Sequence, residues 1–301
     1  MKHLLKLLDL TPEEILGILD LADQLKYEKK HGIPHPRLQG KTLGMIFEKS
    51  STRTRVSFET GMYQLGGHAL FLSSHDLQIG RGEPVQDTAR VLSRYVDGIM
   101  IRTFEQKEVE DFARYGSVPV INGLTDFCHP CQILADLMTI REYKGSFDGL
   151  KMCFIGDGNN MMNSLIVGCL KVGMAVSVAC PEGYRPPQEI LDFAGAYDCF
   201  ELTDDPLTAA KDADVVITDV WTSMGQEEER AAREKAFAGY CVDDRIMAAA
   251  KPDAIVQHCL PAHRGEEITE AVFEANAAPI FDEAENRLHA QKAVMVMLMK
   301  D

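Results

Sequence analysis

The sequence predicts an α/β protein with two doubly wound parallel-sheet domains that are joined by helices. Short apolar runs recur along the whole chain, as at 42–47 and 151–155, and a segment with helical periodicity follows most of them. Strands that alternate with helices form parallel sheets, and the helices cover both faces of each sheet. The chain has 301 residues, which is enough for two domains of ordinary size.

Residues 1–143 are expected to form the first domain. The segment Thr11-Pro-Glu-Glu14 predicts a capping box that starts a helix, and Lys6 and Asp9 interrupt the apolar stretch before it, so we expect no targeting segment. The apolar runs that follow predict strands at 42–47, 69–72, 98–101 and 119–121, and the segments between them predict helices at 52–65, 84–95 and 106–114.

Residues 144–283 are expected to form the second domain with the same alternation. A helix at 132–143 and a loop at 144–149 connect the two domains. The C-terminal segment 284–301 has a helical pattern and is expected to pack back on the first domain. The strands of the second domain are predicted at 151–155, 175–179, 215–218 and 254–257, with helices from the turn at 156–158 to about 172 and at 187–195.

Composition and charge exclude several classes of protein. The formal net charge of −15 argues against non-specific binding to nucleic acids, which needs a basic surface. The apolar runs stay well short of the roughly 20 residues that a membrane-spanning helix requires. The eight cysteines are scattered, and several lie in apolar runs where cysteine acts as a small hydrophobic residue. We therefore expect reduced thiols and a cytoplasmic protein rather than a disulfide framework.

Unusual groups of polar residues follow the predicted strands. In doubly wound sheets, ligands bind beyond the carboxyl ends of the strands, so these residues are the first candidates for a binding site. They form six groups: Ser51–Arg55, Arg102, His129–Gln132, Asn159–Asn160, Asp219–Gly225 and His258–Pro261.

The segment Phe47–Arg55, which reads FEKSSTRTR, lies between a predicted strand and a predicted helix. Ser51 or Thr52 could simply cap the helix. Two arginines nevertheless carry the wrong charge for a helix N-terminus, whose dipole favours anions. Hydroxyl, amide and guanidinium donors together predict a site for phosphate or carboxylate. Arg102, at the end of another strand, either lies exposed or supplies a second guanidinium group to the same anion.

The segment Cys128-His-Pro-Cys131 allows three interpretations. Two cysteines with this spacing occur in redox proteins, but there they follow an early strand of a small domain, whereas here they lie in the middle of the chain. A zinc site would need a second pair of ligands at a suitable spacing, and the sequence offers no clear pair. The third interpretation is that His129 and Gln132 donate hydrogen bonds to a carbonyl or amide of a ligand.

Gly156-Asp-Gly158 partly matches the fingerprint of a dinucleotide-binding loop. Met161 stands where the third glycine is required, and no acidic residue closes the next predicted strand. These departures argue against a nucleotide site. Asn159 and Asn160, at the start of the following helix, either cap that helix or bind the amino-acid end of a substrate.

Two further groups follow strands of the second domain. Asp219 either captures an ammonium group or belongs to an ordinary turn. Cys259 and His258 could form a nucleophile and its base. Neighbouring side chains at the end of a strand point to opposite faces, however, and this argues against the pair.

Four of these groups resemble, in order along the chain, the motifs of the aspartate/ornithine carbamoyltransferase family. Ser51-Thr-Arg-Thr54 resembles the motif for carbamoyl phosphate, and His129-Pro-Cys-Gln132 resembles the motif that recognises the carbamoyl group. Asp219 with Ser223-Met-Gly225 resembles the loop that separates ornithine enzymes from aspartate enzymes, and His258-Cys-Leu-Pro261 resembles the last motif. The order and spacing of all four motifs, across nearly the whole chain, make the resemblance specific.

The resemblance implies an enzyme that transfers the carbamoyl group of carbamoyl phosphate to the side-chain amine of L-ornithine. The amine attacks the carbamoyl carbon directly in a sequential mechanism, and the products are L-citrulline and phosphate. This reaction belongs to arginine biosynthesis or to the arginine deiminase pathway. It needs two substrates in contact and donors for the developing oxyanion, here Thr54, Arg53 and His129. The resemblance implies neither a metal nor an organic cofactor.

The resemblance also implies roles for individual residues. The expected catalytic residues are Arg53, Arg102, His129, Asp219 and Cys259, whereas Arg55 is expected to be structural. Carbamoyl phosphate is expected to bind Ser51, Thr52, Arg53, Thr54, Gln78, Arg102, His129, Gln132, Cys259, Leu260 and Arg287. Ornithine is expected to bind Asn160, Asp219, Ser223 and Met224.

Gln78 lies in the polar segment 73–80, which on its residues alone is an ordinary surface loop. The resemblance implies instead that the protein forms homotrimers, or multiples of trimers. In such an assembly, Gln78 would enter the active site of a neighbouring subunit.

Three rival interpretations remain. Another amine such as putrescine, N-acetylornithine or aspartate could be the acceptor, although Ser223-Met-Gly225 favours ornithine. The protein could be a regulatory homologue that binds the ligand without turning it over. It could also be a thiol redox protein that uses Cys128 and Cys131.

Overall fold

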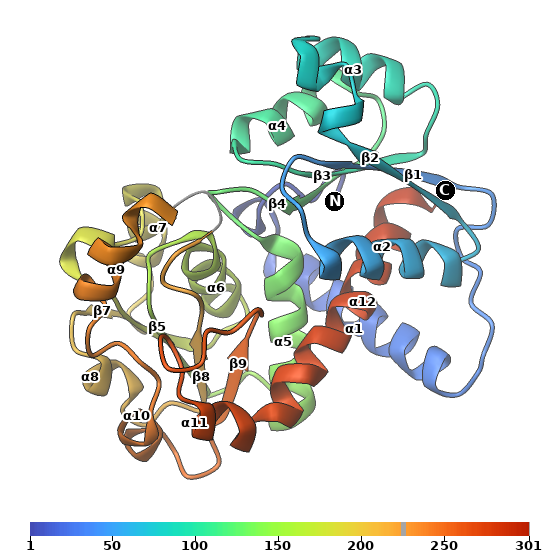
Figure 1. Cartoon of the computed structure of the whole chain (residues 1–301). Helices are drawn as coiled ribbons and strands as arrows, with labels where there is room; N and C mark the ends of the chain where they lie inside the picture. The colour runs from blue at the N-terminus through green and yellow to red at the C-terminus, as the bar shows by residue number, and fades with distance from the viewer. Residues whose placement is uncertain (224–226, 301) are drawn as a thin grey trace. The chain divides into compact units, whose positions relative to one another are not determined.

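The computed structural model describes residues 1–223 and 227–300 and divides the chain into two compact units (Figure 1). Unit 1 contains Met1–Met138 and Glu285–Asp301, and unit 2 contains Thr139–Ala284. The sequence places the first division after residue 143 and the second before residue 284. In the structure, the chain passes from one unit to the other inside two helices, α5 (Pro130–Lys144) and α12 (Ala277–Met299).

Among the described residues, unit 1 is built on a four-stranded parallel sheet with the order β2-β1-β3-β4. Because β2 and β3 lie on opposite sides of β1, the connections that follow β1 and β3 diverge, and ligands of doubly wound sheets bind at such a point. The register pairs Phe47 with Arg102, so the loop after β1 starts beside the end of β3. The strands are β1 (Thr42–Phe47), β2 (His68–Ser73), β3 (Gly98–Arg102) and β4 (Val120–Leu124).

The helices of unit 1 follow the predicted pattern. At the start of α1 (Pro12–Lys30), the Thr11 hydroxyl accepts a hydrogen bond from the Glu14 N–H, and the Glu14 carboxylate accepts one from the Thr11 N–H. This confirms the predicted capping box. The other helices, each within a few residues of its predicted bounds, are α2 (Thr52–Gln64), α3 (Val85–Leu92), α4 (Gln106–Tyr115) and α5.

The C-terminal part of α12 packs on the other helices of unit 1, as the sequence predicts. A Cβ atom on Gly61 of α2 would lie 2.9 Å from the Met295 methyl group, so glycine allows this close packing without a shift of the Met295 side chain. Lys26 of α1 donates a buried hydrogen bond of 2.7 Å to the Asn286 side chain. The last residues of the chain therefore complete the first unit.

In the described part of unit 2, a five-stranded parallel sheet has the order β7-β6-β5-β8-β9. The chain runs from β5 to one edge of the sheet and returns to β8 on the other side of β5. The connections after β5 and β8 therefore diverge, as they do in unit 1. The strands are β5 (Lys151–Ile155), β6 (Ala175–Ala179), β7 (Phe200–Thr203), β8 (Val215–Thr218) and β9 (Ile255–His258).

Helices cover the sheet of unit 2, and the two parallel-sheet units confirm the predicted fold class. They are α6 (Asn160–Lys171), α7 (Gln188–Ala194), α8 (Pro206–Ala210), α9 (Arg230–Ala236), α10 (Asp244–Ala249) and α11 (Glu270–Ala275). The sequence pattern misses β7, because this short edge strand is only partly buried and has no apolar run. None of the helices in the described part of the chain has the length and apolarity that crossing a bilayer requires.

Candidate active site

The start of α2 in unit 1 carries the first group of predicted site residues. Ser51 is the N-cap, because its hydroxyl accepts a hydrogen bond of 3.2 Å from the Thr54 N–H. Thr52 is the first residue of the helix and is exposed. The first turn, all of it described, contains Arg53 and no acidic residue. Capping and anion binding are compatible here, since the cap satisfies only one of the four N–H groups at the helix terminus.

Arg55 has structural partners on the outside of α2. Its Nε donates a hydrogen bond of 3.0 Å to Glu59, one turn later. Its guanidinium group lies over the Phe71 ring, 3.7 Å from the ring centroid. These contacts account for Arg55 without a ligand.

Unit 1 brings together Arg53, Arg102 and Arg287, which we call the arginine cluster, around His129. Burial lowers the pKa of His129 well below its ordinary value, and the charges of the three arginines lower it further. His129 and Arg287 are each only 4% exposed. A chain with a net charge of −15 therefore contains a local group of guanidinium cations beside a neutral imidazole.

Thr54 connects the arginine cluster to the start of α2. Its side chain is fully buried, and its hydroxyl accepts a hydrogen bond of 2.8 Å from Arg287. The Ser51 hydroxyl lies 3.0 Å from the same oxygen. Arg287 stands 233 positions later in the chain, so the packing of α12 on unit 1 delivers it to this helix terminus.

The start of α5 contributes His129 and Gln132, and both side chains are buried. Gln132 donates a hydrogen bond of 2.8 Å to the Asp136 carboxylate one turn later, which orients its amide. A neutral imidazole carries one N–H donor and one acceptor nitrogen. His129 therefore suits an uncharged ligand group such as a carbonyl.

The thiols of Cys128 and Cys131 do not have the properties of a redox pair. Burial raises the pKa of each to about 12. Cys128 donates to the Leu5 carbonyl and Cys131 to the Asn122 carbonyl, both over 3.4 Å. Reactive cysteines have lowered pKa values and access to solvent, so these two act as small buried packing groups.

Gln78 lies between β2 and α3, and its side chain is exposed to solvent. Its backbone carbonyl accepts hydrogen bonds from the N–H groups of Arg81 and Glu83, over 2.8 and 3.1 Å. These bonds fold the segment into a compact turn, η3 (Ile79–Arg81). The exposed side chain is accessible to a second molecule.

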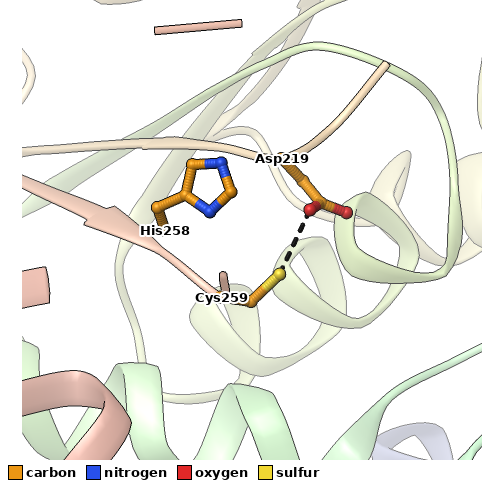
Figure 2. Close-up of side chains that lie close together, drawn as sticks. All are labelled: Asp219, His258 and Cys259. Carbon is orange, nitrogen blue, oxygen red and sulfur yellow. Dashed lines mark hydrogen bonds between the residues drawn. The ribbon is translucent and has the colours of Figure 1, made fainter. Parts of the chain in front are cut away.

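In unit 2, the ends of β5, β8 and β9 meet at Asp219. Asn159 caps α6 by accepting hydrogen bonds from the N–H groups of Met161 and Met162. Its amide nitrogen also donates a hydrogen bond of 3.0 Å to Asp219, which follows β8. The Cys259 thiol, after β9, donates to the other carboxylate oxygen over 3.1 Å, as Figure 2 shows. Residues that follow β5 and β9, the two strands on either side of β8, therefore hold the carboxylate of Asp219.

The other residues predicted for ornithine lie on the same connections. Asn160 is the first residue of α6, and Ser223 lies after β8; both are partly buried. Met224 and Gly225 lie outside the described residues. Three of the four predicted residues therefore come from the point where the connections after β5 and β8 diverge.

Gly158 has a packing role that explains the partial nucleotide fingerprint. A Cβ atom on Gly158 would lie 2.4 Å from the Tyr184 carbonyl oxygen and 2.6 Å from the Pro186 nitrogen. Its own N–H donates to the same carbonyl over 2.8 Å. The glycine is therefore required by close contact with backbone, and this explains its presence without a phosphate.

His258 orients the segment that follows β9. The Leu260 N–H donates to its Nδ1 over 2.9 Å, so Nε2 carries the proton and donates to Glu267 over 2.9 Å. His258 and Glu267 are buried. Both ring nitrogens are engaged, so His258 is not the base for Cys259, as the alternation of side chains predicts. Leu260 has a positive φ of 58°, a backbone conformation that this pair of bonds holds in place.

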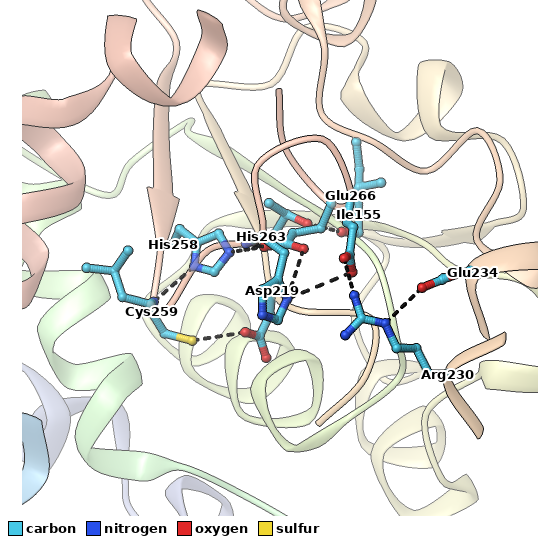
Figure 3. A network of polar contacts seen from close by, with 11 residues as sticks. Ile155, Asp219, Arg230, Glu234, His258, Cys259, His263 and Glu266 are labelled. Carbon is cyan, nitrogen blue, oxygen red and sulfur yellow. Dashed lines mark hydrogen bonds and ion pairs between the residues drawn. The ribbon is translucent and has the colours of Figure 1, made fainter. Parts of the chain in front are cut away.

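A polar network extends outward from these residues, as Figure 3 shows. Two groups in the described part of this network have the chemistry of metal ligands. They are Asp219 with His258 and Cys259, and His263 with Glu266 and Glu267. A metal in the first group would have to displace a hydrogen bond of His258, and Arg230 already pairs with Glu266 of the second.

The sequence pattern misses one buried ion pair that holds the connections of unit 2. Arg233 of α9 donates hydrogen bonds to the Asp157 carboxylate over 2.8 Å and to the Trp221 carbonyl over 3.0 Å. Burial raises the pKa of Asp157 to about 6, even though Arg233 opposes this shift. The pair ties the connection after β5 to the one after β8. Arg233 stands in a run of charged residues, a pattern more typical of a solvated helix face.

Comparison with known families decides which proteins the chain resembles. Residues 2–142 match the model for the carbamoyl-phosphate-binding domain of aspartate/ornithine carbamoyltransferases, and residues 148–298 match the model for their aspartate/ornithine-binding domain. The chain belongs to the aspartate/ornithine carbamoyltransferase family. The first match contains Arg53, Arg102 and His129, and the second contains Asp219 and Cys259.

Individual members of this carbamoyltransferase family match over their full length. The ornithine carbamoyltransferase of Geobacter sulfurreducens is 57% identical over 301 residues, which is 99% of each chain. The solved ornithine carbamoyltransferase of Pyrococcus furiosus is 54% identical, with a TM-score of 0.95 over 99% of this chain and 97% of that one. The anabolic enzyme of Campylobacter jejuni is 47% identical, with a TM-score of 0.94 over 99% of both chains.

Proposed function

We propose that the chain transfers the carbamoyl group of carbamoyl phosphate to the side-chain amine of L-ornithine, giving L-citrulline and phosphate. The observation that carries the proposal is the arginine cluster around a neutral His129. Carbamoyl phosphate has an anionic phosphate next to an uncharged carbamoyl group, which matches these two kinds of partner. Relatives named ornithine carbamoyltransferase, matched over 95% or more of their length, support ornithine as the acceptor.

The phosphate would bind at the start of α2. Backbone N–H groups and hydroxyls there would donate hydrogen bonds to an anion, and the helix dipole would favour its charge. Arg53 and Arg102 would add charge-assisted hydrogen bonds, which are roughly twice as strong as neutral ones. The full set that we propose for the phosphate is Ser51, Thr52, Arg53, Thr54 and Arg102, with Gln78 from a neighbouring subunit.

The carbamoyl group would bind to uncharged and cationic donors. Neutral His129 would donate to the carbonyl oxygen, and Arg53 with Thr54 would help to stabilise the oxyanion that forms during attack. Gln132, oriented by Asp136, would hold the carbamoyl nitrogen. We also assign Arg287, Cys259 and Leu260 to this substrate.

Ornithine would bind to residues of unit 2. The Asp219 carboxylate, held by Asn159 and Cys259, would orient the ornithine ammonium group. The side-chain amine must lose its proton before it attacks, and a cationic pocket would favour the neutral amine. The attack on the carbamoyl carbon is direct and expels phosphate, in a sequential mechanism without a covalent enzyme intermediate. Asn160, Ser223 and Met224 complete the set, Met224 on sequence alone.

An assay of citrulline formation tests this proposal. The purified protein, given ornithine and carbamoyl phosphate, is expected to form citrulline and phosphate in equal amounts. Putrescine, N-acetylornithine and aspartate serve as alternative acceptors. Faster use of any of these three, or binding of carbamoyl phosphate without any turnover, would overturn ornithine transfer as the function.

We propose that the reaction serves arginine biosynthesis in the cytoplasm. The family membership and the similarity to the anabolic ornithine carbamoyltransferase of Campylobacter jejuni support this assignment. Expression in a bacterial strain that lacks ornithine carbamoyltransferase is expected to restore growth without arginine. Failure of the active enzyme to restore growth would favour the arginine deiminase pathway.

We further propose that residues 1–143 with 284–301 form a carbamoyl-phosphate domain, that residues 144–283 form an ornithine domain, and that the chain assembles as a homotrimer. Apolar side chains are exposed on the edge strand β2 and on α2, as a subunit interface requires. They are Leu70, Phe71, Val56 and Tyr63.

Complementation between two inactive variants tests the shared site. Subunits with Arg53→Ala are mixed with subunits with Gln78→Ala and allowed to exchange. Some interfaces then combine an intact Arg53 with an intact Gln78 from the neighbour, so activity is expected to rise well above that of either parent. Exchanged trimers without recovered activity would show that each site belongs to one chain.

A further inference from the structure

Thr103 lies directly after Arg102 and is fully buried. Its hydroxyl oxygen is within hydrogen-bonding distance of two carboxylates, Glu48 from the loop after β1 and Glu108 from the first turn of α4. A hydroxyl group has one proton and can donate it to only one of them. The second contact therefore needs a proton on one of the two carboxyl groups.

The surroundings of Glu108 favour such a proton. Burial raises the pKa of Glu108 to about 7, and the negative charges of Glu48 and Glu105 contribute to the shift, while the bond to Thr103 opposes it. At a pH below this value, the hydroxyl can donate to Glu48 and accept from the Glu108 acid group. Both contacts are then satisfied by a single extra proton.

Lys49, which follows Glu48 in sequence, could compensate the charge of a carboxylate, but it has partners of its own. Lys49 forms an ion pair with Asp126, and its ammonium group lies 4.3 Å from the centroid of the Phe104 ring. The cation that follows Glu48 in sequence is therefore already engaged. A proton shared between the carboxyl groups therefore explains how both can bond to one hydroxyl, whereas the Lys49 cation does not.

The same residues fix the backbone beside the phosphate-binding residues. The N–H groups of Glu48 and Lys49 both donate to the Arg102 carbonyl, over 2.9 and 3.4 Å. The loop after β1 is thus attached to the end of β3 by backbone bonds and by the Thr103 hydroxyl. This loop continues directly into Ser51, and Arg102 belongs to the arginine cluster.

We propose that Glu48, Thr103 and Glu108 form a proton-sharing triad that positions Ser51 and Arg102 for carbamoyl phosphate. These are positioning residues, and the inference rests on the proposed function. Loss of the shared proton leaves two negative charges on one hydroxyl. Repulsion between them then separates Glu48 from Glu108 and loosens the loop after β1 against β3.

The pH dependence of the KM for carbamoyl phosphate tests the triad. In wild type, this KM is expected to rise about tenfold between pH 6 and pH 9, relative to Glu108→Gln, since about one pKa unit of coupling corresponds to tenfold. The carboxamide of Glu108→Gln donates a hydrogen bond at every pH, so its KM lacks this component. The KM of wild type is divided by the KM of Glu108→Gln at each pH. This ratio cancels the effect that titration of the substrate has on both proteins.

Glu105→Gln is the matched control. Glu105 is in the same part of α4 and acts on Glu108 through charge. This variant should keep the rise in KM, with its midpoint moved to slightly lower pH. Equal pH dependence in wild type and Glu108→Gln, with both forming citrulline, would overturn the triad and leave the proposed function intact.

Infrared difference spectra detect the proton on the carboxyl group directly, and a purely structural role of Glu108 would give no such signal. The wild-type spectrum minus that of Glu108→Gln is expected to show the carbonyl stretch of a protonated carboxylic acid at pH 6, and to lose it by pH 9. Thr103→Val should shift this band and abolish the pH-dependent component of the KM, with circular dichroism to verify its folding. If Thr103→Val fails to fold, the wild-type spectrum is still decisive: the band at pH 6 supports the triad, and its absence contradicts it.

Discussion

The polar groups of unit 1 and unit 2 occupy equivalent places in their sheets, but their charges are arranged in opposite ways. In unit 1, three arginine charges act together on His129. In unit 2, Asp219 accepts hydrogen bonds from Asn159 and Cys259, and Arg233 pairs with Asp157. Repulsion between like charges raises the free energy of the folded protein, and an anionic ligand relieves it. Attraction between opposite charges instead connects the segments that carry them.

This contrast predicts that the two units respond differently to substitution. Removal of a charge from the arginine cluster should mainly reduce activity, because we propose that the cluster receives an anion. Removal of a charge from the ion pair of unit 2 should mainly reduce stability, because the partner is then left buried without compensation.

The largest effect is expected for Arg53→Ala, which should lower kcat/KM about 10³-fold, or roughly 4 kcal/mol, through loss of a charge-assisted contact. Arg53→Lys should be nearly as inactive, because a point charge cannot replace the planar guanidinium group. The melting temperature without ligand should be unchanged or higher. Steady-state kinetics and calorimetry give both quantities.

Arg55→Lys is the control for Arg53→Lys. Arg55 contacts Glu59 and Phe71, and lysine can keep the charge in both contacts. Its kcat/KM should stay within about threefold of wild type, well under 1 kcal/mol. Similar losses at both positions would contradict the distinction between a ligand-binding and a structural arginine.

Arg233→Ala should lower the free energy of unfolding by about 3 kcal/mol, the usual cost of leaving a buried charge without its partner. Denaturant titration followed by Trp221 fluorescence measures the change near the pair. Arg230→Ala is the matched control, since this exposed arginine of the same helix should cost less than about 1 kcal/mol. Equal losses of unfolding free energy in the two variants would show that the buried pair contributes no more to stability than the exposed one.

Asp219→Asn should impair ornithine use about a hundredfold, or roughly 2.7 kcal/mol. Binding of carbamoyl phosphate, measured by calorimetry, should change by less than about threefold, because the charged partners that we propose for it lie in the arginine cluster. A large loss of carbamoyl-phosphate affinity with normal use of ornithine would reverse the assignment of the two substrates.

The most gradual effect, spread over about two pH units, concerns Asp157, whose pKa in the folded protein is about 6, above the ordinary value of 3.8. As pH rises, the unfolded chain loses this proton first, so stability falls between about pH 4 and pH 6 and is level above. Relative to Asp157→Asn, wild type should lose about 3 kcal/mol over this range, since each pKa unit corresponds to about 1.4 kcal/mol. Parallel stability curves for the two proteins would contradict the raised pKa.

The parts of the candidate site that follow strands could be predicted from sequence. Arg102 and Asp219 stand directly after apolar runs, Ser51 follows such a run after three polar residues, and the ends of parallel strands meet at one edge of a sheet. Local pattern was sufficient for these positions, because a strand is recognisable from its own few residues.

Residues delivered by long-range packing could not be predicted in this way. Arg287 lies within a long helix, and the sequence shows no sign that it reaches Thr54; only the family resemblance suggested its role. Glu267 and Arg233 stand in charged runs that look solvated, and their burial depends on the packing of segments far apart in sequence. The contact between Thr103 and Glu108 likewise forms only when α4 folds against the ends of β1 and β3.

The contact between Arg287 and Thr54 has a consequence for the order of events during synthesis. A ribosome translates segment 51–54 long before the guanidinium group that reaches it, because Arg287 stands 233 positions after Thr54. All of Thr139–Ala284 leaves the exit tunnel before the final helical turns that fill the space beside Gly61. The whole of the second unit is therefore synthesised before Arg287 can reach Thr54, so this contact within the first unit forms only after residues 139–284 have been translated.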